Sequence, residues 1–285
     1  MATRQAPARR QPAAKEPAPT TSRAKSAPAT RRQRFRRRYA VVYDIDGPRV
    51  RLGILWFTAA SIALVLGPLT AAIVYGAAAA VAAMQTARAW RRRKQRPNRL
   101  VAAGAAGGMA LGACLDAGGA GLAVLAGTAA AVAVATVDPK SRNPAVVDAG
   151  WTIQCSLPVG LAAMSMVLLT RLDQGSAIAL LLLVSAYETG DYLVGSGARN
   201  PFEGPVAGIA AVTVLTFIVS TLSVSAFDVG QAWLFGAAVA VLVPLGQLFA
   251  SALLPKAAAR ASALRRLDSL LLAGPVWWLG VTTVT

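Results

Sequence analysis

Apolar stretches follow one another along the chain from Leu52 to its end, separated by short polar segments. Each is roughly 15–22 residues long, and about 20 apolar residues form a helix that crosses a bilayer of about 30 Å. We therefore predict an all-α, polytopic transmembrane helical bundle of about nine spans. The predicted spans are 52–67, 68–87, 100–115, 117–137, 152–170, 175–195, 205–225, 229–250 and 269–284.

Two of the predicted boundaries depend on single residues. Gly67 and Pro68 form a turn signal, which favours a tight hairpin between the first two spans. Asp116 interrupts the apolar pattern between the third and fourth spans. An alternative merges those two spans around Asp116, which leaves eight spans and moves the C-terminus to the other side of the membrane.

The N-terminal part of the chain has a different composition. Residues 1–38 are rich in Ala, Pro, Arg, Thr and Ser and have almost nothing apolar to bury, which predicts a disordered basic tail. Residues 39–51 are then a short juxtamembrane segment, and residues 52–285 form the transmembrane domain.

The basic residues fall almost entirely in alternate connecting segments. Of the 29 Lys and Arg residues, 28 lie in segments 1–51, 88–99, 138–151, 196–204 and 251–268, and Arg171 is the exception. Because cytoplasmic loops are enriched in Lys and Arg, this distribution places the N-terminus in the cytoplasm. The net charge of +17 is then explained by topology and by anionic phospholipid headgroups, and we expect no nucleic-acid partner.

The residue types that are absent also exclude several functions. The chain has no histidine, which excludes a Ser-His-Asp triad, an HExxH zinc site and haem ligation by histidine. Its two cysteines, Cys114 and Cys155, sit in apolar surroundings and are expected to be small buried side chains.

Four acidic residues lie near the predicted cytoplasmic ends of spans. Glu188 and Asp191 are three positions apart, so both carboxylates project from one helical face. Glu203 precedes the seventh span and Asp268 opens the last one. Taken singly, each is explained at least as well as a helix-end charge. Taken together, they suit a hard divalent cation such as Mg²⁺ and a phosphate-bearing substrate, and both interpretations stay open here.

Four sequence blocks carry a family resemblance. The run ETGDYLVG from Glu188, followed by NPFEGPVAG from Asn200, resembles the phosphatidate cytidylyltransferase (CDP-diacylglycerol synthase) family. That family has Asp-x-Gly-Ala-Tyr-x-x-Gly, then Ser-Pro-x-Lys-Thr-Trp-Glu-Gly. The run LRRLDSL at 264–270 resembles its Leu-Asp-Arg-x-Asp-Ser-Leu signature, and GQLFAS at 246–251 resembles the Gly-Asp-x-x-Glu-Ser before it. The blocks follow the family order within about residues 50–285.

The resemblance implies an enzyme of phospholipid synthesis that joins CTP to phosphatidic acid with the help of Mg²⁺, giving CDP-diacylglycerol. The Ala- and Arg-rich composition points to a bacterial inner membrane, and a homodimer is compatible with this interpretation. Carried onto this sequence, the family's motifs imply catalytic roles for Asp268, Arg266 and Ser269, metal binding by Glu188 and Asp268, and substrate binding by Glu203, Gly204, Asp191 and Tyr192.

The sequence also departs from the family pattern. Arg265 stands where the signature has its first Asp, and Gln247 and Ala250 replace an Asp and a Glu. The Lys-Arg, Lys-Asp and Gly-His-Gly-Gly elements of the family are absent. A cation at position 265 is expected to lie where Mg²⁺ would bind. The alternative function is therefore a catalytically inactive relative that binds lipid or acts as a membrane scaffold.

Overall fold

The structure, a computed structural model, describes residues 47–91, 93, 95–137, 143–198, 200, 202–222 and 229–284. This part of the chain is helical and contains no strand. The predicted tail 1–38 and residues 39–46 of the predicted juxtamembrane segment lie outside it, and residues 47–51 of that segment form the start of α2. The helices are α2 (Gly47–Leu66), α3 (Pro68–Arg91), α4 (Arg99–Ala113), α5 (Ala117–Val137), α6 (Ala145–Leu172), α7 (Gln174–Gly195), α8 (Glu203–Leu222), α9 (Val229–Ala252), α10 (Leu264–Leu267) and α11 (Leu270–Val284).

The helices confirm the predicted membrane-spanning fold. Six of them, α3 and α5 to α9, are long and apolar enough to cross a membrane, and α10 and α11 together form a seventh such segment, Leu264–Val284. Two shorter apolar helices, Arg51–Leu66 and Arg99–Ala113, lie at the first and third predicted spans. Gly67 separates α2 from α3 with a φ of 112°, a left-handed conformation that glycine adopts without steric cost. The Gly-Pro signal therefore marks a real turn.

The alternative prediction, in which the third and fourth spans merge into one, is wrong. α4 ends at Ala113 and α5 begins at Ala117, and the two helices pack against each other. Asp116 accepts a hydrogen bond of 2.6 Å from the N–H of Gly119, so it caps the start of α5 and does not interrupt a longer helix. A Cβ on Gly112 would lie 2.5 Å from the carbonyl oxygen of Gly119, which explains why the hairpin needs glycine at this crossing.

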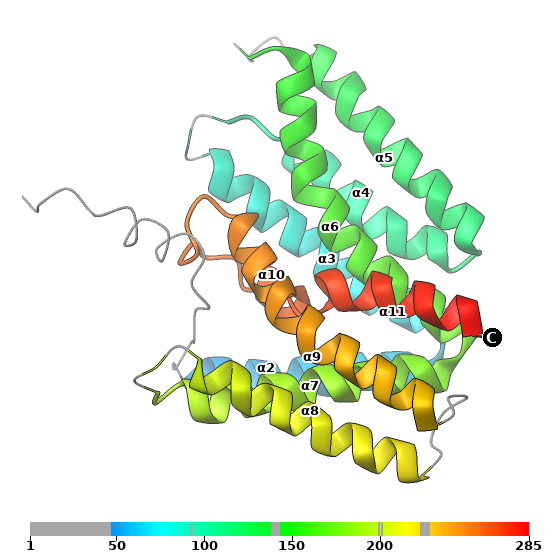
Figure 1. The fold of residues 1–285 in the computed structure, drawn as a ribbon. Helices are drawn as coiled ribbons and strands as arrows, with labels where there is room; N and C mark the ends of the chain where they lie inside the picture. The colour runs from blue at the N-terminus through cyan, green and yellow to red at the C-terminus, as the bar shows by residue number, and fades with distance from the viewer. Residues whose placement is uncertain are drawn as a thin grey trace, which may run out of the picture.

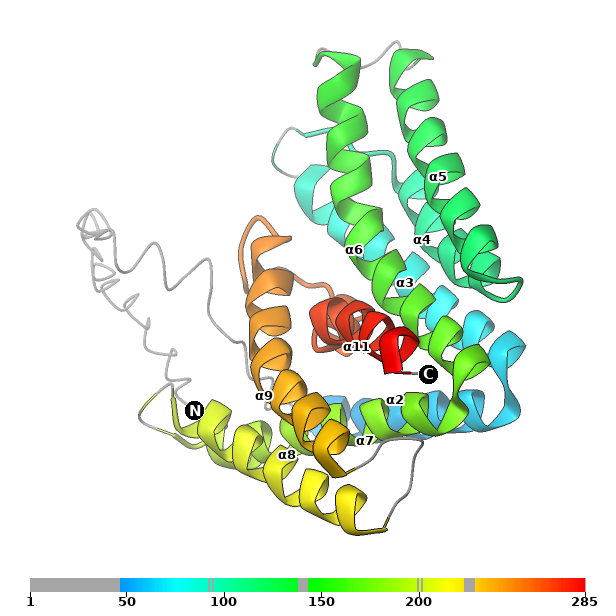
Figure 2. The ribbon, with the colours of Figure 1, turned by 45° about the vertical axis from the view of Figure 1, so that its right-hand side comes forward.

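Two groups of helices make up the bundle. One contains α3, α4, α5 and α6, and the other contains α2, α7, α8 and α9 (Figure 1). Helix α11 lies between α6 and α9, as Figure 2 shows from a second direction. Much of the core consists of fully buried alanines, such as Ala79, Ala106 and Ala162, which let the helix backbones approach closely.

The basic end of α3 is fixed to the segment that leads into α10. The indole Nε1–H of Trp90 donates to the carbonyl oxygen of Leu253 at 2.7 Å. The backbone N–H of Ala263 donates to Oε1 of Gln85 at 3.0 Å. The basic segments 88–99 and 251–268 therefore lie at the same end of the bundle, as the charge distribution predicts.

Candidate active site

Helix α7 carries two of the predicted acids to this basic end. It starts at the opposite end, where the carboxylate of Asp173 caps it by accepting from the N–H groups of Gly175 and Ser176. Glu188 and Asp191 lie in its last two turns, three residues apart and on one face. The Asp191 side chain is buried, with 3% of its surface exposed.

The third acid, Asp268, lies at the junction of α10 and α11. Its own backbone is helical, and its side chain is 6% exposed. Helix α9 crosses this junction at Gly246, where an added Cβ would lie 2.5 Å from the carbonyl oxygen of Asp268. The glycine of the GQLFAS block therefore lets α9 pack directly against the signature segment.

The hydroxyl of Ser269 connects the acids of the two segments. It donates to Oε1 of Glu188, and it lies 3.4 Å from Oδ1 of Asp268, which also accepts the Ser269 backbone N–H at 3.0 Å. Because both carboxylates lie within reach of one hydroxyl, they are well inside the roughly 10 Å beyond which they could not share a metal or a bridged metal pair. The structure thus brings together Glu188, Asp268 and Ser269, which we call the Ser269 cluster.

Arg265 contacts this cluster from the other side of Asp268. Its Nη1 lies 3.4 Å from Oδ2 of Asp268, and its Nη2 donates to Oγ of Ser251 at 3.1 Å and to the carbonyl oxygen of Ala257 at 2.9 Å. Arg265 is therefore paired with Asp268. Two protein oxygens hold the guanidinium in place, so Arg265 forms part of the fixed structure of the site.

Arg266 points toward helix α2. A Cβ on Gly53 would lie 3.2 Å from its Nη1, so the guanidinium packs closely over this glycine and would have to shift to make room for a side chain there. The positive charge of Arg266 also acts on the Glu188 carboxylate. Arg266 therefore acts on Glu188 through its charge, whereas Arg265 forms an ion pair with Asp268.

The other predicted substrate-binding residues lie apart from this cluster. Glu203 is exposed at the start of α8, Gly204 is buried behind it, and Tyr192 is half-buried on α7. Within the described residues, no hydrogen bond or ion pair joins any of the three to the Ser269 cluster. The structure places them on the flank of the site, on the helix pair α7–α8.

Two glycines of the matched blocks serve helix packing. An added Cβ on Gly190 would lie 2.7 Å from the carbonyl oxygen of Ala207, and one on Gly208 would lie 2.9 Å from the Tyr187 ring. These contacts hold α7 against α8 and so fix the position of Glu188. Sequence reasoning did not identify Gly53 or the pairing of Arg265 with Ser251; only the family position of Ser251 pointed to this region.

The donor set suits a cation that is shared with a substrate. In the part of the chain that the structure describes, no group of three or more His, Cys, Asp or Glu side chains could hold a metal ion. Mg²⁺ is commonly held by one or two carboxylates together with substrate phosphates, and Glu188 and Asp268 provide two carboxylates. The residues therefore fit one Mg²⁺ that is completed by a phosphate, whereas Arg265 leaves little room for a second metal beside Oδ2 of Asp268.

Comparison with known proteins places the chain in a family. The model of the cytidylyltransferase family matches residues 48–258, which is more than half of the chain and extends from α2 to beyond the end of α9. No curated protein matches the chain. The matched region contains Glu188, Asp191 and Ser251, and it ends before the α10 segment that carries Asp268. The chain belongs to the cytidylyltransferase family.

Proposed function

We propose that the protein transfers CMP from CTP to the phosphate of phosphatidic acid, releasing pyrophosphate and forming CDP-diacylglycerol. Membership of the cytidylyltransferase family supports the use of CTP. The single observation that carries the proposal is the Ser269 cluster, in which Glu188 and Asp268 meet at one hydroxyl beside Arg266. The cluster lies at the basic end of the bundle, which attracts both anionic substrates.

The proposed reaction is a phosphoryl-group displacement. An oxygen of the lipid phosphate attacks the α-phosphorus of CTP, a new P–O bond forms, and the bond from that phosphorus to the β-phosphate oxygen breaks. The electron pair leaves with pyrophosphate. An ionised lipid phosphate needs no base for this step, so the protein acts mainly by positioning the two reactants and by neutralising charge.

The residues of the site have separate tasks in this proposal. Arg266 binds two oxygens of a phosphate through its planar guanidinium. Ser269 orients a phosphate by donating its hydroxyl, which has a single proton and so must release Glu188 to do so. Glu188 and Asp268 would hold Mg²⁺, which neutralises charge on the phosphates when bound.

The flank of the site provides supporting contacts. Asp191 and Glu203 are supporting acids that limit how a triphosphate lies. Tyr192 contacts the substrate near the start of α8, and Gly204 lets α8 begin close to α7. Exposed apolar side chains border the same edge: Leu193 and Phe202 are 70% and 71% exposed. We assign these apolar side chains to contacts with the acyl chains of phosphatidic acid. They lie next to Asp191 and Glu203, which in this proposal lie near the phosphate headgroup.

The experiment is an assay of the purified protein with CTP labelled at the α-phosphate, phosphatidic acid and Mg²⁺. The proposal expects label in the lipid extract for the wild type and its loss for Asp268→Ala. The matched control is Asp116→Asn, which keeps the cap of α5 and lies in the α4–α5 turn. Absence of lipid label in the wild type would contradict the proposal.

A second candidate is an inactive relative that binds lipid without turnover. The observation that favours it is the pairing of Arg265 with Asp268, which occupies one oxygen of the carboxylate. The same assay separates the two candidates: the inactive relative retains phosphatidic acid on the purified protein but forms no product, whereas the enzyme forms product in proportion to protein.

A further inference from the structure

One glutamine of α3 holds the segment that leads into the candidate active site. Gln85 lies in the last two turns of α3. Its Oε1 accepts from the backbone N–H of Ala263 at 3.0 Å, and its Nε2 donates to Oγ of Ser262 at 3.5 Å. Both polar groups of the Gln85 amide are therefore directed at the two residues that immediately precede α10.

Helix α10 depends on contacts from outside its own sequence. It spans only Leu264–Leu267, and a helix of one turn is not stable by itself. Ala263, at its N-cap position, has no side-chain oxygen with which to cap the first turn. Gln85 instead accepts from one of the backbone N–H groups that the start of a helix leaves without an intrahelical partner.

Apolar packing alone would leave α10 room to shift. Leu264 and Leu267 are fully buried, but the burial of apolar surface has no preferred direction. A hydrogen bond does have one, because it weakens steeply as its angle departs from a straight line. The bond to Gln85 therefore fixes the height and rotation of α10, the helix that carries Arg266 and ends at Asp268.

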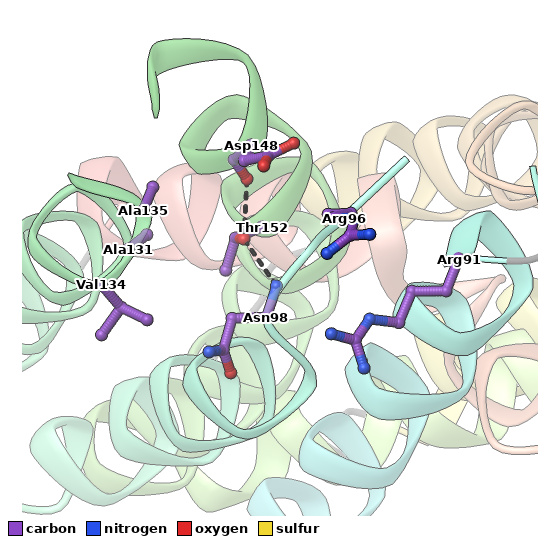
Figure 3. A pocket seen from close by; sticks show the side chains of 8 residues that line it. All are labelled: Arg91, Arg96, Asn98, Ala131, Val134, Ala135, Asp148 and Thr152. Atoms are coloured by element: carbon purple, nitrogen blue, oxygen red, sulfur yellow. Dashed lines mark hydrogen bonds between the residues drawn. The ribbon is translucent and has the colours of Figure 1, made fainter. Parts of the chain in front are cut away.

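The end of α3 is itself held in place by α6. The Trp90 ring packs on the ring of Trp151 in α6, with the two centroids 4.3 Å apart. Further along the basic segment 88–99, the backbone N–H of Asn98 donates to Oγ1 of Thr152 at 3.0 Å (Figure 3). Helix α6 therefore holds this segment near both of its ends, and the contact with α10 starts from a fixed part of the bundle.

We propose that Gln85 is a positioning residue of the transfer reaction. It acts through Ala263 on the position of α10. Helix α10 in turn determines where Arg266 and Asp268 lie relative to Glu188. Reacting groups must be held to within about 0.5 Å, so even a small shift of α10 slows the transfer. The inference rests on the function proposed above and adds to it a residue that touches neither substrate.

The test compares Gln85→Leu with Gln174→Leu in the full-length protein, assayed with labelled CTP, phosphatidic acid and Mg²⁺. Gln174 is the matched control, because its Nε2 also joins two helices, donating to the carbonyl oxygens of Leu64 and Val65 at the opposite end of the bundle. Both variants lose side-chain hydrogen bonds, so both should unfold at a lower temperature. We expect kcat to fall on the order of tenfold in Gln85→Leu alone. The KM for CTP should stay within about twofold of the wild-type value, since the flank formed by α7 and α8 is left in place.

Two further variants separate positioning from a general loss of stability. Gln85→Glu keeps an oxygen that accepts from the Ala263 N–H, and we expect it to restore most of the wild-type kcat. Ala263→Pro removes that N–H and leaves Gln85 in place, and the φ of −68° at Ala263 is one that proline adopts. Its effect on kcat should equal that of Gln85→Leu and should not add to it in the double variant. Ala263→Pro also carries the test if Gln85→Leu does not fold.

The proposed function and this inference fail on different results. A wild-type protein without turnover would contradict the proposed function, and the inference with it. A wild-type protein with turnover would overturn the inference alone on any of three results: equal kcat in Gln85→Leu and Gln174→Leu, no recovery of kcat in Gln85→Glu, or additive effects of Gln85→Leu and Ala263→Pro.

Discussion

Arg265 and Asp268 form an ion pair in which Nη1 of the arginine lies 3.4 Å from Oδ2 of the carboxylate. The other carboxylate oxygen, Oδ1, faces Ser269. The cation at position 265 is therefore paired with the acid three residues after it. Asp268 is therefore held at both carboxylate oxygens, with Oδ2 paired to Arg265 and Oδ1 bonded to Ser269.

Removal of the Arg265 side chain tests whether this ion pair is structural. Arg265→Ala leaves Oδ2 of the buried Asp268 and the carbonyl of Ala257 without their donor. An unsatisfied buried polar group costs about 1–3 kcal/mol, so we expect a lower unfolding temperature in detergent. The control is Arg260→Ala, an exposed arginine in the same segment. Equal unfolding temperatures for the two variants would show that the ion pair contributes no stability.

The hydroxyl of Ser269 is expected to act on the transfer step. Ser269→Ala removes the donor that reaches Glu188 and, in the proposal, a substrate phosphate. Loss of one preorganised donor reduces kcat by on the order of 10²-fold, and we expect a smaller change in the KM for CTP. Ser269→Thr keeps the hydroxyl and should retain part of the activity. Equal kcat values for Ser269→Ala and the wild type would show that the Ser269 hydroxyl takes no part in the transfer step.

Gly53 is expected to control the position of Arg266. A valine at position 53 would push the guanidinium away from its place over α2, because even a Cβ would lie 3.2 Å from Nη1. We expect Gly53→Val to weaken phosphatidic acid binding by roughly tenfold. This factor corresponds to the loss of about 1.4 kcal/mol, as expected for one charge-assisted hydrogen bond. Gly104→Val is the matched control, since an added Cβ at Gly104 meets nothing within 4 Å. Equal affinities in the two variants would mean that Arg266 does not bind the lipid phosphate.

Gly246 should be required for stability. In Gly246→Ala the new methyl group would lie 2.5 Å from the backbone carbonyl of Asp268, which cannot rotate away as a side chain can. Overpacking of this kind costs about 1–3 kcal/mol, so we expect a lower unfolding temperature. In Gly121→Ala the methyl group meets nothing within 4 Å, and the same change should leave the unfolding temperature close to that of the wild type.

The spans could be predicted from the sequence because a bilayer imposes a length on every apolar helix. The Gly67–Pro68 turn was predictable for a similarly local reason, since few residues adopt the backbone conformation found there. Asp116 was ambiguous, because a carboxylate between two apolar runs either interrupts one helix or caps the next. Only the hydrogen bond to Gly119 decides between these roles.

The site was predictable only in part. The family order of the blocks led to Glu188, Asp268 and Ser269, which the structure brings together. The partners of Arg265 were not predictable, because the path of residues 253–263 depends on how Trp90 and Gln85 hold that segment. Contacts of this kind, between segments far apart in the chain, are not encoded by any local sequence pattern.

The most direct test of the central claim is the transfer of label from the α-phosphate of CTP into lipid by purified wild type, Glu188→Gln and Asp116→Asn, measured side by side. Glu188→Gln keeps the shape of the side chain and removes its charge from the Ser269 cluster. The account predicts labelled CDP-diacylglycerol from the wild type and from Asp116→Asn, and a loss of on the order of 10²-fold in Glu188→Gln. Equal label from all three proteins, or none from the wild type, would contradict it.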